Sequence, residues 1–239
     1  MRRPTFDEPN FTEPVEVVFG EGATLPGIEP QPDLPDLSAP VTAELTDPVD
    51  EPMVGLCHPR IRNLENYRVA GWTHAVEGTW LRASVADRLG RVADRLPADW
   101  ELYVFDAWRP LELQAELFEA AYALPGTEPD FMAPASVDPA TPPPHVTGGA
   151  VDLGLGWRGI PLAPGGPFDD RTANAHTDAL EQQPGPAREL RRFLYWSMRA
   201  EGFVVFHHEW WHFEYGTRGW AALTGCPAVF GPTAPPGFG

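Results

Sequence analysis

The amino-acid sequence predicts an α+β fold. Segments with the 3.6-residue periodicity of amphipathic helices and short apolar segments typical of strands occur along the same chain. They do not follow the strict strand–helix–strand repeat of a parallel sheet, which argues against an α/β fold. The length of 239 residues and the apolar fraction of 43% suit one large globular domain, alone or with a sizeable arm.

The first sixty residues differ in composition from the rest of the chain. They are rich in proline and in acidic residues, as in LPGIEPQPDLPDLSAP (25–40). Because proline at this density interrupts regular helix and sheet, we predict an acidic arm over residues 1–60, extended or partly disordered, beside a domain over residues 61–239. Within the arm, VEVVFG (15–20) has the character of one edge strand. The end of the domain is again a Pro/Gly-rich tail.

Helical and strand patterns follow one another through the domain. Apolar residues three to four positions apart predict the first helix, and Pro110 stands at a position that favours the start of the second. In chain order we expect a helix over 78–96, a strand over 100–108, a helix over 110–124, a Pro-rich loop over 124–144, a strand over 149–155, a mostly irregular segment over 156–185, a helix over 186–202 and a strand-like aromatic segment over 203–216.

Charge and composition exclude several classes of function. The 34 acidic residues outnumber the 17 basic ones, giving a net charge of −17 that repels nucleic acid and anionic membranes, so neither is expected as a partner. Every basic residue is arginine, which excludes Schiff-base chemistry, a Ser-Lys dyad and a P-loop lysine. No apolar segment is long enough to span a membrane, and the first twenty residues lack the apolar core of a secretory signal. We therefore expect a cytoplasmic protein, in which Cys57 and Cys226 would be reduced, buried thiols rather than a disulfide.

The segment HVTGGAVDLG (145–154) holds two groups that can bind a metal ion. His145 and Asp152 lie seven residues apart, with Gly148 and Gly149 between them. Glycine tolerates positive φ and has no side chain, so we interpret this pair as making room around a site that both ends share. Taken alone, the spacing favours a solvated loop histidine and a capping aspartate over a metal site.

A second segment, HHEWWHFEYG (207–216), strengthens the case for a metal. Glu209 and His212 are three residues apart, so in a regular strand they would point to opposite faces; reaching one site requires a bulge or a turn. His212 would complete a His145, Asp152, His212 set with one position open for water, as in catalytic zinc sites. Glu209 would then take a proton from that water. The alternative is a buried aromatic strand with incidental polar residues.

Other polar residues receive weaker assignments. Arg109, in FDAWRP, ends a strand before a helix and would point a permanent cation into a cleft, where it would stabilise an oxyanion. By itself, a surface salt bridge to Glu112 or Asp106 explains this arginine better. His207 and His208 are expected to be second-sphere or structural residues. Surface positions are expected for the remaining histidines, His58, His74 and His176.

Taken together, HVTGGAVDL, EWWHF and DAWRP resemble the zinc D,D-peptidase family, and within it the D-alanyl-D-alanine dipeptidases of the vancomycin-resistance type. The wider family, which includes D,D-carboxypeptidases and the hedgehog signalling domain, has the patterns S-x-H-x-x-G-x-A-x-D and E-x-x-H. RRFLYWSMRAEGF (191–203) and PFD (167–169) also resemble the dipeptidase branch, so the resemblance covers roughly residues 62–216. The matching motif positions are His145, Gly148, Ala150, Asp152, Glu209, Trp210, Trp211 and His212.

The resemblance implies a role for each of these site residues. It makes His145, Asp152 and His212 the ligands of one Zn²⁺ per chain, Glu209 the general base and acid, and Arg109 the oxyanion stabiliser. Asp169 would lie near the free ammonium of the substrate, and Trp210, Trp211 and Asp169 would close a small pocket. The family serine two residues before the histidine is Pro143 here, which puts the substrate preference in doubt because proline has neither a hydroxyl nor an N–H.

The sequence therefore predicts a zinc dipeptidase whose central antiparallel sheet carries the site and is flanked by helices. The expected substrate is D-Ala-D-Ala or a related D-amino-acid dipeptide, with the exact dipeptide and the oligomeric state left open. One alternative is a D,D-carboxypeptidase that trims longer peptidoglycan peptides. Others are a non-catalytic zinc-binding protein and, on a bare acidic surface, a metal-free binding module.

Overall fold

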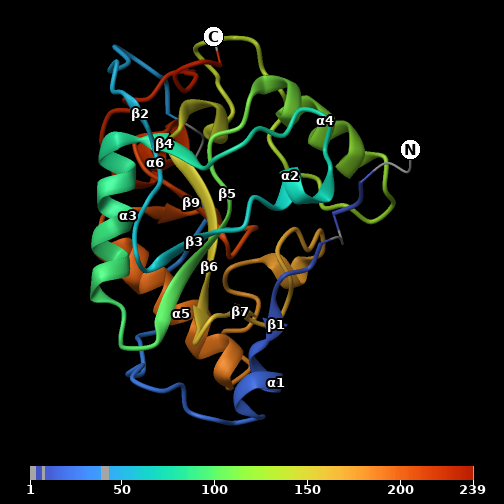
Figure 1. Ribbon diagram of the computed structural model, residues 1–239, viewed down its shortest axis with the longest axis vertical. Coiled ribbons are helices and arrows are strands. Elements are labelled where there is room, and N and C mark those ends of the chain that lie inside the picture. The colour runs from blue at the N-terminus through green and yellow to red at the C-terminus, as the bar shows by residue number, and fades with distance from the viewer. Residues whose placement is uncertain (1–3, 7–8, 39–42, 239) are drawn as a thin grey trace.

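The computed structural model describes residues 4–6, 9–38 and 43–238. Within these residues, helices surround a mostly antiparallel sheet, which confirms the predicted α+β class (Figure 1). The strands are β1 (Glu13–Pro14), β2 (Met53–Gly55), β3 (Ile61–Asn63), β4 (Trp80–Arg82), β5 (Trp100–Asp106), β6 (Ala150–Trp157), β7 (Ile160–Ala163), β8 (Val204–Val205) and β9 (His212–Glu214). The helices are α1 (Val15–Phe19), α2 (Asn66–Ala70), α3 (Ala83–Arg95), α4 (Leu111–Tyr122), α5 (Pro186–Ala200) and α6 (Arg218–Thr224), with 3-10 helices η1 (Pro144–Thr147) and η2 (Ala173–Ala175).

Strand β6 is the centre of the main sheet. It pairs antiparallel with β5 along one side; along the other, it pairs with β9 near its start and with β7 near its end. Strand β3 joins β5 in parallel, β1 joins β7 in parallel, and β8 pairs antiparallel with β9. Because β6 has neighbours on both sides, its backbone is held by ladders at each edge, and its residues are almost entirely buried.

The predicted helices form, with one shortened at its start. The segment 78–96 contains α3 only from Ala83, because Trp80–Arg82 form β4 and pair antiparallel with β2. On α3, Val85, Leu89 and Val92 are buried at the helical spacing that predicted this helix. In the view of Figure 1, α3 lies along one flank of the sheet, and α2 and α4 lie on the opposite flank.

The segment 156–185 is more regular than expected. It contains β7, which closes a tight hairpin with β6, and the short helix η2. Polar turn residues dominate this part of the sequence and hide the four-residue strand, whose pairing with β6 and β1 is a tertiary effect.

Two expectations for residues 1–60 are wrong. VEVVFG forms helix α1 rather than an edge strand, and the edge strand is the two-residue β1 immediately before it. Pro14, at the helix N-cap, lacks an N–H and so suits a helix start, while Val15 is buried. Prolines also do not prevent pairing at β2, which lies between Pro52 and Pro59 in sequence.

Parts of this proline-rich segment lie against the domain. The indole N–H of Trp100 donates to the carbonyl of Pro26 at 2.7 Å, and that of Trp196 donates to the carbonyl of Pro32 at 3.0 Å. Proline carbonyls are free to accept such bonds because the segment makes few bonds of its own there. The division of the chain at residue 60 stays a prediction.

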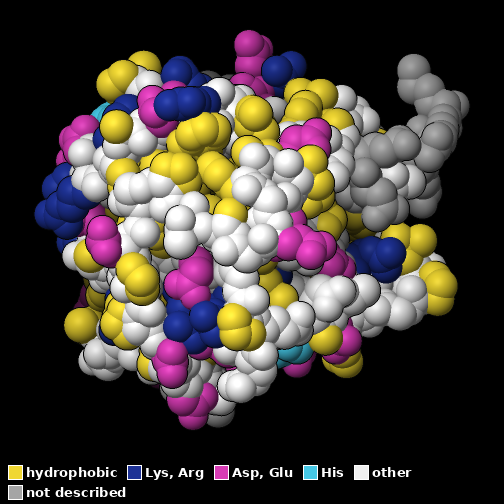
Figure 2. Space-filling model, turned by 90° about the horizontal axis from the view of Figure 1, so that it is seen from below, with side chains coloured by type: hydrophobic (Ala, Val, Ile, Leu, Met, Phe, Trp, Pro, Cys, Tyr) yellow, Lys and Arg dark blue, Asp and Glu magenta, His cyan; other side chains and the backbone are white. Residues whose placement is uncertain are grey.

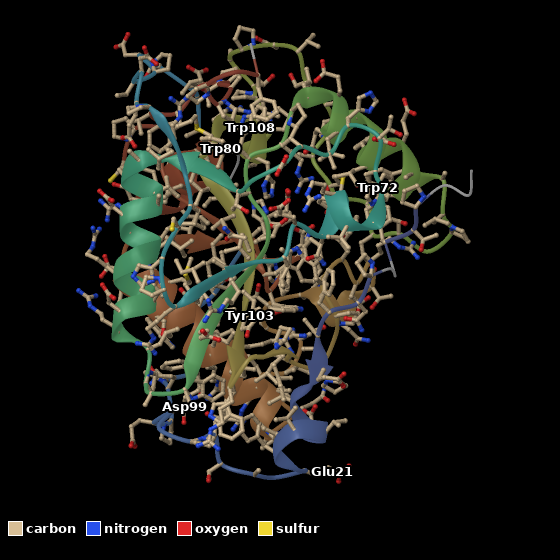
Figure 3. The ribbon with its side chains drawn as sticks, in the orientation of Figure 1. Glu21, Trp72, Trp80, Asp99, Tyr103 and Trp108 are labelled. Atoms are coloured by element: carbon tan, nitrogen blue, oxygen red, sulfur yellow. The ribbon has the colours of Figure 1, made fainter. Side chains whose placement is uncertain are left out.

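The C-terminal tail packs back onto the upper end of the molecule in Figure 3, where Trp80 and Trp108 lie close together. The ring of Phe238 contacts both, with centroid distances of 6.5 and 5.8 Å. The indole N–H of Trp108 also donates to the carbonyl of Thr233 at 2.8 Å. Aromatic packing and this hydrogen bond therefore attach the Pro/Gly-rich tail to the domain.

The two cysteines differ from expectation in their exposure. Cys57 and Cys226 are free thiols, and both are exposed rather than buried. Each lies in a connecting segment, Cys57 after β2 and Cys226 after the left-handed glycine that ends α6. Such segments run over the surface, so their side chains do not enter the core.

The surface carries the acidic excess of the chain. On the face shown in Figure 2, acidic side chains stand singly or in small groups among arginines and apolar side chains. Several arginines form ion pairs with these acids, such as Arg62 with Glu101 and Arg158 with Asp99. No helix in the described part of the chain has both the length and the apolar character of a membrane span.

Two glycines are expected to respond oppositely to substitution by alanine. A Cβ at Gly149 would lie 2.6 Å from the carbonyl oxygen of Tyr215, so Gly149→Ala should lower the free energy of unfolding by about 1–3 kcal/mol. Gly90, inside α3, has only an ordinary 3.6 Å contact at that position, so Gly90→Ala should raise it by about 0.5–1 kcal/mol. Urea denaturation of both variants measures the difference; equal effects would show that the backbone at Gly149 yields easily.

Candidate metal centre and active site

The register of three strands places charged residues in one row. Asp152 on β6 lies opposite Asp106 on β5 and opposite His212 on β9. A bulge between Val104 and Asp106 shifts the β5 register at this point. Bulges re-aim side chains at the ends of ladders, and this one brings Asp106 into the row beside Asp152.

His145 reaches the row from helix η1. Gly148 ends this helix in the left-handed conformation, with φ of 71°, and the chain then enters β6. A Cβ at Gly148 would lie 2.5 Å from the sulfur of Met53, and one at Gly149 would meet Tyr215, Thr217 and Phe230. Our interpretation of this glycine pair is therefore wrong in its location. The glycines make the turn and allow close backbone packing, but the space they leave is not at the ligand atoms.

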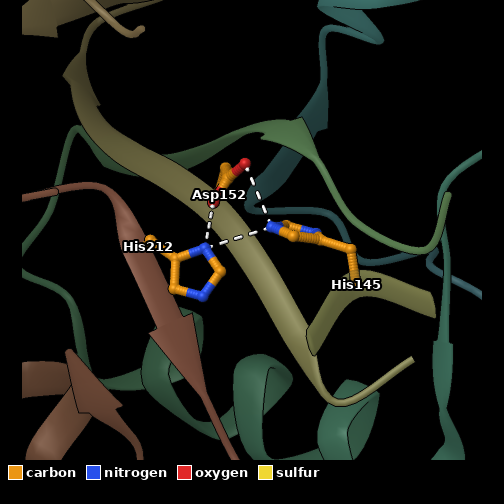
Figure 4. Close-up of side chains that lie close together, drawn as sticks. All are labelled: His145, Asp152 and His212. Atoms are coloured by element: carbon orange, nitrogen blue, oxygen red, sulfur yellow. Dashed lines mark hydrogen bonds and ion pairs between the residues drawn. The ribbon is translucent and has the colours of Figure 1, made fainter. Parts of the chain in front are cut away.

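The three predicted metal ligands meet in one buried group (Figure 4). His145 Nε2 lies 3.3 Å from Asp152 Oδ2 and 3.1 Å from His212 Nδ1. His212 Nδ1 lies 3.0 Å from Asp152 Oδ1. Ligands at zinc–ligand distances of about 2.0–2.1 Å in a tetrahedron would be about 3.3–3.4 Å apart, so the spacing fits a small cation.

Hydrogen bonds on the outer nitrogens fix both histidine tautomers. His145 Nδ1 lies 2.6 Å from the carbonyl oxygen of Ala107, which can only accept, so this nitrogen carries the hydrogen. His212 Nε2 lies 3.1 Å from Glu214 Oε1 and donates to it in the same way. In neutral histidines, the inner nitrogens are then lone-pair donors. Two lone pairs and a carboxylate facing one point require a cation between them.

Electrostatics favour a cation at the same point. Although burial acts to raise it, the pKa of Asp152 is lowered by the two histidines. Burial acts to lower the pKa of His212, but hydrogen bonds and charges from Asp152 and Glu214 raise it well above its usual value. The inner nitrogen of His212 therefore binds either a proton or a metal ion, and the two compete for it.

Two consecutive turns bring Glu209 to the metal side. The N–H of Glu209 donates to the carbonyl of Phe206, and the N–H of His212 donates to the carbonyl of Glu209, both at 3.2 Å. This confirms the predicted departure from a regular strand between β8 and β9. Glu209 Oε2 lies 3.7 Å from His212 Nδ1, and burial raises the pKa of Glu209 to about 8.

Arg109 is buried in the site rather than paired at the surface. Its Nε donates to Asp106 Oδ2 at 2.7 Å and its Nη2 to Asp152 Oδ2 at 3.3 Å. Nη1 donates to Gln114 Oε1 at 3.3 Å, which holds the guanidinium plane from a third side. With 3% of its surface exposed, Arg109 is a fixed cation next to the metal ligands, and Asp106 is its partner but does not make it a surface pair.

Asp169 is a buried carboxylate with strained backbone. Its φ is 62°, uncommon for a residue other than glycine, and Tyr67 donates to its Oδ1 at 3.1 Å. Burial raises its pKa well above the usual value. The turn-capping role falls to Asp170, which accepts from the backbone and hydroxyl of Thr172. Tyr67 was missed by the sequence analysis, since it lies in an irregular segment without a motif.

One cavity of about 700 Å³ collects these side chains. Trp211 and Asp169 line it, but Trp210 does not; its ring packs edge-on against Phe105, with centroids 6.3 Å apart. Trp210 therefore does not close the pocket, and the pocket is not small. Part of the wall is apolar, formed by Phe131, Met132, Pro134, Pro142, Val204 and Leu223.

The remaining histidines lie outside the ligand set. His207 and His208 line the edge of the cavity, as expected for residues near the site but not in it. His74 is exposed, while His58 and His176 are partly buried.

Glu214 is expected to tune metal affinity through His212. In Glu214→Ala, the outer nitrogen of His212 loses its acceptor, and such losses weaken metal binding by about 10–100-fold. Competition with a chromophoric chelator measures the affinity. Glu116→Ala, which removes the carboxylate that pairs with the exposed His74, should bind metal like the wild type. Unchanged affinity in Glu214→Ala would contradict the assigned hydrogen bond.

Comparison with known proteins agrees with this geometry. The profile of the peptidase M15 family, described as D-ala-D-ala dipeptidase, matches residues 82–226. A D-alanyl-D-alanine dipeptidase of Synechocystis sp. is 30% identical over 176 residues, which cover 59% of this chain and 71% of the relative. A D-alanyl-D-alanine dipeptidase of Escherichia coli K12 is 34% identical over 116 residues, covering 48% of this chain and 54% of the relative. The matched region contains every proposed ligand, and the chain belongs to the M15 family of metallopeptidases.

Proposed function

We propose that the protein hydrolyses a small dipeptide, D-Ala-D-Ala or a related D-amino-acid dipeptide, in the cytoplasm. The observation that carries this proposal is the meeting of three metal-ligand side chains, Glu209 and Asp169 on the wall of one cavity. The names of the two relatives supply the substrate class.

His145, Asp152 and His212 would hold one Zn²⁺ ion. Two imidazole nitrogens and one carboxylate oxygen suit zinc better than the harder magnesium or calcium ions. When bound, the ion polarises the scissile carbonyl and lowers the pKa of water in its open position. The outer hydrogen bonds to Ala107 and Glu214 keep both imidazoles oriented for that purpose.

Glu209 would move the proton. Its carboxylate lies beside His212 and faces the cavity, so it can take a proton from the attacking water and deliver it to the leaving amine. A pKa near 8, raised by burial, is close to neutral pH, where one group performs both transfers well. A structural zinc site needs no such residue, which speaks against a non-catalytic zinc protein.

Arg109 would stabilise the negative charge that develops on the carbonyl oxygen. Asp106 and Gln114 hold its guanidinium in place before the substrate arrives, so no reorganisation is needed during the reaction. Arginine stays protonated throughout, and the neighbouring carboxylates raise the pKa of Arg109 further against the effect of burial.

Asp169 and Tyr67 would select a free amino terminus. The Asp169 carboxylate is buried in the wall and has Tyr67 as its hydrogen-bond donor, which leaves acceptor capacity for a substrate ammonium. Trp211 lines the same cavity. Pro143 also lines it but offers no hydroxyl, so this chain must bind substrate there without the family hydrogen bond.

A D,D-carboxypeptidase acting on longer peptidoglycan peptides is the second candidate. The cavity of about 700 Å³ favours it, because this volume exceeds what a dipeptide of small residues fills. The carboxylate of Asp169 opposes it, since a longer peptide has no ammonium at that place. Incubation with D,D, L,D and L,L dipeptides and with a longer peptide ending in D-Ala-D-Ala, followed by detection of released amine, separates the two.

Glu209→Gln should keep the metal but lose hydrolysis by about 10²–10⁴-fold, because both proton transfers need the carboxylate. Metal analysis and the rate of D-Ala-D-Ala hydrolysis, measured on the same preparation, test this. Glu112→Gln, which changes an exposed glutamate at the start of α4, is the matched control and should behave as wild type. Loss of metal together with activity would instead make Glu209 a ligand.

N-acetylated dipeptides should be cut about 10²–10³-fold more slowly than free dipeptides. Acetylation removes the ammonium and leaves Asp169 buried without its partner, a loss of roughly 3–5 kcal/mol. Asp169→Asn should shrink this preference, whereas Asp170→Asn, which removes a turn-capping carboxylate next to it, should preserve it. Equal rates on free and acetylated substrates in the wild type would refute the ammonium role and favour the carboxypeptidase.

A further inference from the structure

A second group of potential metal ligands lies beside the cavity. His176 and Asp178 come from the segment after η2, and His207 comes from the turn after β8. One nitrogen or oxygen atom from each residue lies within 4.8 Å of the other two. His207 Nε2 and Asp178 Oδ1 are 3.2 Å apart. The segments are about thirty residues apart in sequence, so tertiary structure alone brings these groups together.

Part of this group lacks the hydrogen bonds that buried nitrogens normally have. His176 Nε2 and His208 Nδ1 are both shielded from solvent and have no hydrogen-bond partner among the described residues. The His176 ring stacks on His208, with centroids 4.8 Å apart, and lies 5.5 Å from the ring of His207. Buried polar atoms are seldom left without a partner, so this arrangement requires an explanation.

The cluster suits a metal ion better than a proton. Burial and the neighbouring rings of His208 and His207 lower the pKa of His176, which keeps its imidazole neutral and able to donate a lone pair at neutral pH. A simple His–carboxylate ion pair would explain His207 and Asp178, but it would leave His176 without a role.

We propose that His176, Asp178 and His207 form a second site for a divalent transition-metal ion of the zinc class. Two imidazoles and one carboxylate favour such an ion over magnesium or calcium. The site is separate from the catalytic group, because its three ligands are His176, Asp178 and His207 and none is shared with His145, Asp152 or His212. Asp178 is exposed, so the ion would enter from solvent and water would complete its coordination.

An ion here would connect two segments that support the active site. The N–H of Thr177 donates to the carbonyl of His207 at 2.8 Å, and the N–H of Trp210 donates to the carbonyl of Ala175 at 2.9 Å. These bonds already join the segment after β7 to the turn that carries Glu209. A bound ion adds a side-chain link to the same pair of segments and so restrains that turn from the surface.

Equilibrium dialysis of the full-length protein against Zn²⁺ at neutral pH tests the proposal. The wild type should bind one zinc ion per chain more than His176→Ala and one more than His207→Ala, measured by metal analysis. His74→Ala, which removes a histidine paired with Glu116 but lacking a second histidine nearby, should bind as much as the wild type. Since only differences are compared, the result does not depend on what the catalytic group binds.

A second measurement follows the restrained segment. Adding Zn²⁺ should slow amide hydrogen exchange over residues 173–178 in the wild type and leave it unchanged in His207→Ala. Equal zinc content in the wild type and both cluster variants, with equal exchange in this segment, would overturn the proposal and leave an ordinary His207–Asp178 ion pair.

Discussion

The position of β6 between β5 and β9 is the constraint on which the site depends. Asp152 contributes to both ladders, so the same backbone pairing that builds the sheet fixes its distance from Asp106 and from His212. A shift of one residue in either ladder would turn the side chains to the other face of the sheet. The full burial of β6 and its neighbours on both sides make such a shift costly, and the site inherits that rigidity.

The charges around the cavity explain why this rigid frame requires a cation. Asp152, Asp169, Glu209 and Glu214 are all buried, and Arg109 is the permanent cation beside them. Uncompensated carboxylates are expensive to bury, and burial accordingly raises the pKa of Glu209 and Asp169. A divalent ion among the ligands supplies the missing positive charge and lets Glu209 ionise, while a substrate ammonium does the same for Asp169. Ion and substrate thus neutralise different parts of one acidic cavity.

Spacing and motif predicted the ligand set, and geometry supplied the rest. His145, Asp152 and His212 are brought together as expected, and the i,i+3 separation of Glu209 and His212 correctly required a turn. The motif did not separate the two tryptophans, because their facing depends on the turns between β8 and β9, which bury Trp210 against Phe105. Tyr67 and β7 were invisible to sequence reasoning, since long-range contacts rather than local pattern give them their roles.

The turn between β8 and β9 links the two metal groups of the molecule. His207 lies at its start, Glu209 in its middle and His212 where β9 begins, so a six-residue segment serves both sites. Its backbone is held from the β7 side by Thr177 and Ala175, not by a continuous ladder. Turns held by a few bonds open more readily than strands, so the acid-base residue lies on the least constrained part of an otherwise rigid frame. A surface ion on His207 would act on this weak point, restraining Glu209 without touching the ligands that perform the chemistry.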